Sequence, residues 1–170
     1  MGYTVKDLLE SNNFSEMQLI SDDSGIGREI KGVRIIEVPD MEKFLGGGEL
    51  LLTSMRAYEA TEEDVFLHHL KELDKKQISG FIVKCCQRTE HLKRLFDILM
   101  EFSQEHHLPV IEISEDLYFW GIIKHILLQL CDIETAKLKY FKMTHDNLSN
   151  ILLNVIDSRE SIERIFFLIS

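Results

Sequence analysis

The 170-residue sequence has no long hydrophobic run. No stretch approaches the roughly 18 consecutive apolar residues that a membrane-spanning helix needs, and residues 1–10 lack the charged-then-apolar pattern of a signal peptide. Cysteine is also scarce, and two of the three residues, Cys85 and Cys86, are adjacent. A disulfide between neighbours would strain the peptide that joins them. We therefore expect a soluble, cytoplasmic protein without a disulfide framework.

Positive charge is in short supply. The chain has 19 Lys and Arg residues against 29 Asp and Glu residues, a formal net charge of −10. Because neutralising phosphates requires clustered Lys and Arg, and no basic stripe is present, this segment is not expected to grip nucleic acid itself. The composition, 45% hydrophobic and 28% charged, is that of an ordinary globular chain. The length fits one domain plus an appendage of a few helices.

The first 48 residues contain short predicted elements. Thr4 and Asp7 have the spacing of a capping box, which predicts a helix over residues 5–11. Residues 17–20 and 32–38 favour strands, and residues 41–45 favour one helical turn. The glycines at 46–48 precede the next strand and are not followed by Lys-Ser/Thr, so they fit a flexible turn better than a phosphate-binding loop.

A regular alternation follows and predicts a βαβαβ core. Apolar runs at 50–53, 81–84 and 109–113 are separated by amphipathic helical patterns at 61–76 and 89–106. Thr61 and Thr89 are the predicted N-caps of these helices. Short, almost wholly apolar strands joined by helical crossovers are typical of a parallel sheet. The predicted class is α/β, with a small, mostly parallel sheet that carries helices on both faces.

The remainder of the chain predicts a helical C-terminal extension. Residues 117–130 read as an apolar helix, and apolar residues then recur every seven positions, which suits packing on a partner helix. These predicted dimer-interface residues are Phe141, Leu148, Val155 and Ile162. Asp157 to Glu160 has the character of a new N-cap, so we expect two helices there. The sequence stops within an apolar run without a C-cap, as expected of a piece of a longer protein.

The sequence predicts no catalytic residue, metal site or cofactor. The neighbouring pairs His68-His69 and His106-His107 each point about 100° apart on a helix, so we expect ordinary surface histidines. No Gly-x-Ser-x-Gly elbow is present. Cys85 and Cys86 are the residues most open to interpretation as nucleophiles, and nothing near them in sequence lowers a thiol pKa.

Ligand binding is predicted at the carboxyl ends of the parallel strands, where open α/β sheets hold their ligands. The candidate ligand-binding residues, chosen by position, are Glu37, Asp40, Thr53, Ser54, Lys84 and Gln87.

Several of these segments together resemble a known family. The segments are Gly25 to Val33, Val38-Pro39-Asp40, Gly48 to Thr53, Gly80 to Lys84, Leu108 to Ile111 and the helix 119–130. Over residues 4–131 the chain resembles the N-terminal domain of purine catabolism regulator (PucR-type) transcription factors. Where that family commonly continues Thr-Thr-Gly, this chain has Thr53-Ser54-Met55.

The resemblance implies a non-catalytic sensor or regulatory domain, residues 1–131, followed by a helical linker and the start of a downstream domain, residues 132–170. It implies a small-molecule effector, a purine or purine catabolite, and contact with DNA only through a C-terminal helix-turn-helix that this chain lacks. Two alternatives stay open. One is a dimerisation module without a ligand, and the other is a substrate-binding accessory domain like the opening of Mur ligases.

Overall fold

The computed structural model of the protein describes residues 2–11, 13–14, 16–36, 38, 41–84 and 89–169, and for residues 154–169 it describes the backbone alone. The chain divides into two compact units, residues 1–130 and residues 131–170. The first unit contains a β-sheet with its covering helices, and the second consists of the later part of one long helix.

The described residues form one five-stranded, mostly parallel sheet with the strand order β1-β5-β4-β3-β2. The strands are β1 (Met17–Leu19), β2 (Gly32–Ile35), β3 (Glu49–Thr53), β4 (Gly80–Lys84) and β5 (Val110–Ile113). Strands β2 to β5 are parallel, and β1 pairs antiparallel with β5 at one edge. The predicted α/β class is confirmed, and β2 is shorter than the predicted 32–38.

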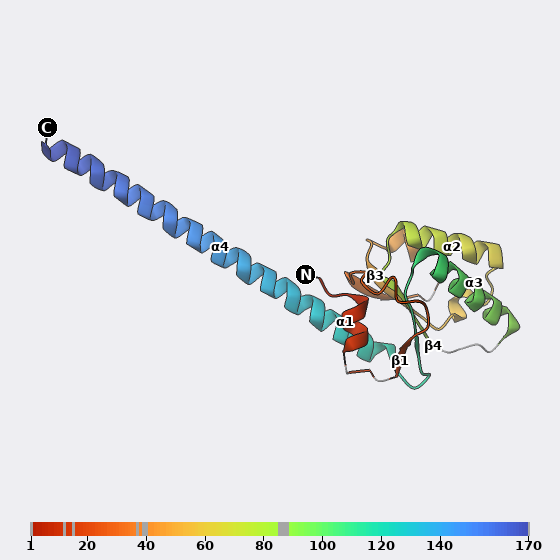
Figure 1. Ribbon diagram of the computed structural model, residues 1–170. Helices are drawn as coiled ribbons and strands as arrows, with labels where there is room; N and C mark the ends of the chain where they lie inside the picture. The colour runs from red at the N-terminus through yellow and green to blue at the C-terminus, as the bar shows by residue number, and fades with distance from the viewer. Residues whose placement is uncertain are drawn as a thin grey trace. The chain divides into compact units, whose positions relative to one another are not determined.

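Helices cover both faces of the sheet (Figure 1). The helices α2 (Glu63–Lys75) and α3 (Glu90–His106) share a core cluster with Leu51, Phe81 and Val110. The intervening strand residues point to the opposite face, because side chains alternate along a strand. That second face is covered by α1 (Val5–Glu10) and the first turns of α4 (Phe119–Ile169), whose buried residues lie outside the first cluster. These residues are Val5, Leu8, Ile122 and Ile126.

The predicted N-caps Thr4 and Thr89 are confirmed. Thr4 and Asp7 form a capping box at α1, and the Thr89 hydroxyl accepts the Leu92 N–H at α3. The prediction for α2 is wrong, because that helix begins at Glu63 with Glu62 as its N-cap. The Thr61 N–H donates to the Tyr58 carbonyl at 2.9 Å. Thr61 is therefore still part of the turn that follows the 3-10 helix η2 (Arg56–Tyr58).

The prediction of two C-terminal helices is also wrong. The helix α4 runs without interruption from Phe119 to Ile169, through the predicted cap at 157–160. The sequence has neither Gly nor Pro after Gly121, so no residue forces an end to the helix. Asp and Ser in a helix interior lower its stability by only about 0.5 kcal/mol each, which continuation of the backbone hydrogen bonds outweighs. Among the described residues, no helix is long and apolar enough to cross a membrane.

Candidate functional site at the carboxyl ends of the parallel strands

The topology places a switch point, the position at which open α/β sheets form their ligand-binding crevice, at the carboxyl ends of β4 and β5. The chain leaves β4 toward α3 on one face of the sheet and leaves β5 toward α4 on the other. Ligands of open α/β sheets bind where successive connections diverge in this way. Between β3 and β4 there is no such divergence, since α2 and α3 both pack on the same face.

Lys84, the last residue of β4, lies at this switch point. Its Nζ donates to the Glu115 carbonyl at 3.1 Å. The same ammonium lies 5.6 Å from the ring centre of Tyr118 and 5.2 Å from that of Phe119. Each cation–π contact of this kind contributes about 0.5 to 1 kcal/mol at a partly exposed site. Lys84 therefore fastens the end of β4 to the first turn of α4.

The same turns of α4 are held from the α1 side. His125 Nε2 lies 3.2 Å from the Tyr3 hydroxyl, and the Phe14 ring packs edge-on against the imidazole with 5.4 Å between ring centres. Burial, and secondarily the Asp7 carboxylate, raises the pKa of Tyr3 to about 12. Movement at the start of α4 would thus disturb contacts with both the sheet and the residues that flank α1.

The candidates Thr53 and Lys84 do not share a face of the sheet. Thr53 pairs with Val83 in the β3–β4 register, so Lys84 points the other way. Thr53 is fully buried, and its hydroxyl accepts the Met55 N–H at 2.9 Å. Ser54 beside it is half-buried. Thr53 therefore shapes the turn after β3, and its hydroxyl already has a partner within the chain.

Met55 has a left-handed backbone, with φ at 64°. Glycine adopts this region without strain, which fits the Thr-Thr-Gly that is common at this point in the resembled family. The remaining candidates, Glu37, Asp40 and Gln87, lie outside the described residues, as do Cys85 and Cys86.

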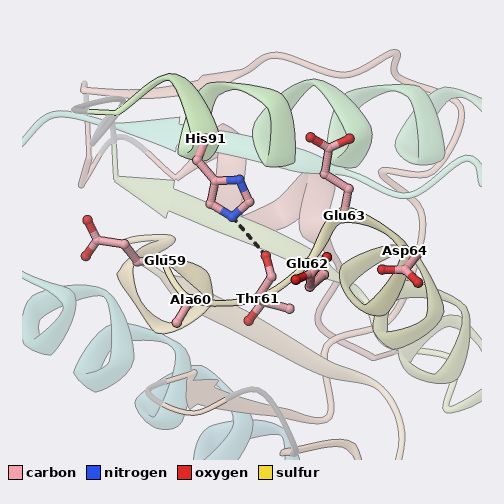
Figure 2. Close-up of a pocket in the computed structure, with 7 residues that line it drawn as sticks. All are labelled: Glu59, Ala60, Thr61, Glu62, Glu63, Asp64 and His91. Atoms are coloured by element: carbon pink, nitrogen blue, oxygen red, sulfur yellow. Dashed lines mark hydrogen bonds between the residues drawn. The ribbon is translucent and has the colours of Figure 1, made fainter.

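A pocket of about 520 Å³ opens at the same edge of the sheet, where the chain passes from β3 into α2 (Figure 2). His91 at the start of α3 donates from Nε2 to the Thr61 carbonyl at 2.8 Å and closes one side. The other lining side chains are mainly acidic, namely Glu59, Glu62, Glu63 and Asp64. The positive, amino-terminal end of the α2 dipole stabilises carboxylates at this position. This accounts for the acidic residues without a bound ligand. Sequence reasoning did not select this pocket, although the acidic run 59–64 was a visible signal.

A second pocket of about 600 Å³ lies at the opposite, amino edge of the strands. Arg28, Lys31, Lys76 and the glycines 46–48 line it, with Glu29 and Gln77. The backbone N–H groups of Gly46 and Gly47 both donate to the Glu49 carboxylate at 2.8 Å. The glycine turn is therefore filled by the chain's own anion, consistent with the rejection of a phosphate-binding loop.

One histidine prediction is wrong. His69 is only 6% exposed, and its Nε2 lies 2.9 Å from the hydroxyl of Tyr58. The Glu42 carboxylate lies 3.0 Å from Nδ1 on the other side of the ring. Burial raises the pKa of Tyr58 well above its usual range. Helical periodicity places His69 on the same face as Phe66 and Leu73, but the partners that allow its burial come from segments that only the fold brings together. Among the described residues, no group of three or more His, Cys, Asp or Glu side chains is placed to hold a metal ion.

These observations define a small α/β domain whose last strand leads into a long helix, with the helix start fastened to the strand ends. Residues 7–130 match the Purine catabolism regulatory protein-like family, PucR, and the chain therefore belongs to this family of regulatory proteins. The purine catabolism regulatory protein of Bacillus subtilis (strain 168) is 23% identical over 151 residues, which cover 88% of this chain and 28% of that relative. The family resemblance drawn from the sequence is confirmed, and the chain spans less than a third of the relative's length.

Proposed function

We propose that residues 2–130 form a non-catalytic, effector-responsive domain of a cytoplasmic transcriptional regulator. DNA is bound by a helix-turn-helix elsewhere in the longer protein. The observation that carries this proposal is the contact of Lys84 with Glu115, Tyr118 and Phe119, because it joins a strand end to the first turn of an uninterrupted 51-residue helix. Family membership supports a regulatory role over the accessory domain of a Mur-ligase-like enzyme.

The mechanism is a shift between two arrangements of the α4 start. A ligand in the crevice with a carboxylate or carbonyl oxygen competes with the Glu115 carbonyl for the Lys84 ammonium and withdraws it from the two rings. A ligand shifts the equilibrium only by its difference in affinity for the two arrangements. The lost contacts amount to about 1 to 3 kcal/mol, which is the usual range of coupling energies between sites.

Purines and purine catabolites are the first ligands to test, on the strength of the relative's name. In a thermal unfolding screen of the chain, a ligand at a hundred times its Kd adds about 2.7 kcal/mol, which is a readable shift in midpoint. We expect a saturable shift from at least one member of a panel of purines, ureides and carboxylic acids.

The matched variants are Lys84→Met and Lys71→Met. Both remove one ammonium and keep an apolar stem, but Lys71 is exposed on α2 and away from the crevice. The thermal shift should be unchanged in Lys71→Met. In Lys84→Met the apparent affinity for the ligand should fall at least about tenfold, which is equivalent to about 1.4 kcal/mol. Equal ligand affinity in both variants would show that Lys84 does not take part in ligand binding.

A ligand-free interaction module is the second candidate. It is favoured by the large apolar side chains that α4 exposes, such as Phe141 at 67% and Leu152 at 61%. If no ligand shifts the well-folded chain, this function takes the place of effector sensing.

A further inference from the structure

The second unit, residues 131–170 of α4, exposes more apolar surface than an isolated helix tolerates. Over residues 138–153, eight large hydrophobic side chains are each more than half exposed. They are Leu138, Tyr140, Phe141, Met143, Leu148, Ile151, Leu152 and Leu153. So many exposed large apolar side chains on one helix indicate an interaction site.

The spacing of the apolar residues identifies the partner as another helix. Phe141 and Leu148 are seven residues apart, and the sequence continues the series with Val155, Ile162 and Ile169. A second series three residues later runs through Thr144 and Ile151 to Ser158 and Ile165. Together they form a seam with the 3.5-residue period of two helices that wind around each other. We refer to these nine positions as the seam.

The seam has a defined amino-terminal end. The next two positions in the series are Glu134 and Lys137, which are paired with each other within the helix at 2.8 Å. Two charged layers cannot be buried in a seam without a large desolvation cost. Helix pairing therefore begins at about Leu138, beyond the first unit.

Charge allows the partner to be an identical helix. Residues 131–170 carry five basic and six acidic residues, so two copies of this unit barely repel. Residues 1–130 carry 14 basic and 23 acidic residues, a net charge of −9, so two copies of the sheet unit repel each other. Charge therefore opposes self-association at the sheet unit and has little effect on it at the helix.

The polar positions of the seam fit either orientation of the two helices. The Thr144 hydroxyl donates to the Tyr140 carbonyl of its own helix at 3.0 Å, so it needs no polar partner across the seam. In a parallel, in-register pair Thr144 faces Thr144, and in an antiparallel pair it faces an apolar residue of the first series. Cross-linking distinguishes the two orientations.

We propose that residues 138–169 pair with the same helix of a second copy of this chain. The proposal is independent of any effector.

Sedimentation of the whole chain over a range of concentrations tests self-association. The wild type should form a reversible dimer. Leu148→Glu places a charge in the seam and should raise the dimer Kd at least about 100-fold, about 2.7 kcal/mol. The matched control is Leu153→Glu, which makes the same substitution at a side chain that is 59% exposed and outside the seam. Leu153→Glu should leave the dimer intact.

Folding of the sheet unit is followed in the same samples by the near-UV signal of its aromatic residues, so loss of dimer is distinguished from unfolding. A wild-type chain that stays monomeric at every concentration overturns the proposal. So does equal disruption by Leu148→Glu and Leu153→Glu.

Cross-linking determines the orientation of the two helices. In a chain whose three cysteines are replaced by Ser, a parallel, in-register pair brings residue 151 of both copies together, so Ile151→Cys then forms a disulfide-linked dimer on mild oxidation. Leu153→Cys in the same background is the control and should not cross-link. A dimer that persists without a cross-link at position 151 has the antiparallel arrangement.

Discussion

At the scale of single residues, side chains with several partners fix the ends of the elements. Arg28 donates to the carbonyls of Ile78 and His106, each at 2.9 Å, and so ties two loops at the amino edge of the sheet. A planar guanidinium can serve two acceptors at once, which a lysine ammonium does less well. By contrast, the exposed ion pair between Lys75 and Glu72 on α2 adds little to the stability of the fold, because solvent screens the two charges.

The capping box of α1 provides a prediction for Thr4. Thr4→Ala removes the oxygen that accepts the Asp7 N–H and should lower the free energy of unfolding by about 1 kcal/mol. The hydrogen bonds from Thr4 lower the pKa of Asp7 below its usual 3.8. A lowered pKa stabilises the fold above pH 3.8, and that contribution is lost as the pH falls through the folded pKa.

Urea unfolding of wild type and Thr4→Ala at neutral and acidic pH measures this effect. The difference between them should shrink in acid. Lys6→Ala, at an exposed position of the same helix, is the control and should change stability by less than about 0.5 kcal/mol at either pH. A Thr4→Ala penalty as small as that of the control would contradict the capping role.

Tyr3 provides a prediction in which stability is lost at high pH instead of at low pH. Since burial, and then Asp7, raises the pKa of Tyr3 from 10.0 to about 12, the unfolded chain loses this proton first. The stabilisation by neutral Tyr3 is fully present below pH 10 and is lost as the pH rises through about 12. The difference in unfolding free energy between wild type and Tyr3→Phe should therefore be constant near neutral pH. Between pH 10 and about 12 the wild type should lose stability relative to Tyr3→Phe. A difference that stays flat across that range would show that Tyr3 titrates alike in both states.

At the scale of elements, the first turns of α4 belong to the core of the first unit. Ile126 is fully buried, whereas Leu128, two residues along the same helix, is 53% exposed. Ile126→Ala should lower the free energy of unfolding by about 2 to 5 kcal/mol, because it removes buried methyl groups and leaves a cavity. Leu128→Ala deletes a side chain of similar size and should cost less than about 1 kcal/mol. Chemical unfolding of both variants checks this, and similar losses would mean that this part of α4 does not dock as described.

The continuity of α4 provides a second prediction at this scale. Within an uninterrupted helix, Ser158→Ala should raise the helix stability by about 0.5 kcal/mol, since Ala has the higher propensity. If Ser158 or its neighbour capped a new helix, the same change would lower stability, by about 1 kcal/mol. Far-UV circular dichroism during thermal unfolding shows whether Ser158→Ala raises or lowers the helix stability. Ser158→Gly should lower the helix stability and is the reference for a destabilising change.

At the scale of the whole molecule, the negative charge is divided unevenly between the units. The first unit carries nearly all of it, and none of the nine seam residues is charged. The dimer proposed above should therefore not weaken as salt is added. The seam has no interhelical ion pairs for salt to screen, and salt does screen the repulsion between the two sheet units. Sedimentation at low and high sodium chloride concentration measures the Kd. A dimer that dissociates on addition of salt would mean that charge pairs, and not the seam, hold it.

The sequence by itself determined the class of fold, the order of its elements, the caps Thr4 and Thr89, and the family, because each depends on local patterns that read directly along the chain. It also placed Lys84 at the end of a strand. The partners of Lys84, the separation of Thr53 from it and the burial of His69 were decided only by the tertiary structure. Each depends on register and on segments far apart in sequence, such as β4 with the start of α4. The single helix through 157–160 was a different failure, since two local preferences competed there and the longer run of backbone hydrogen bonds prevailed.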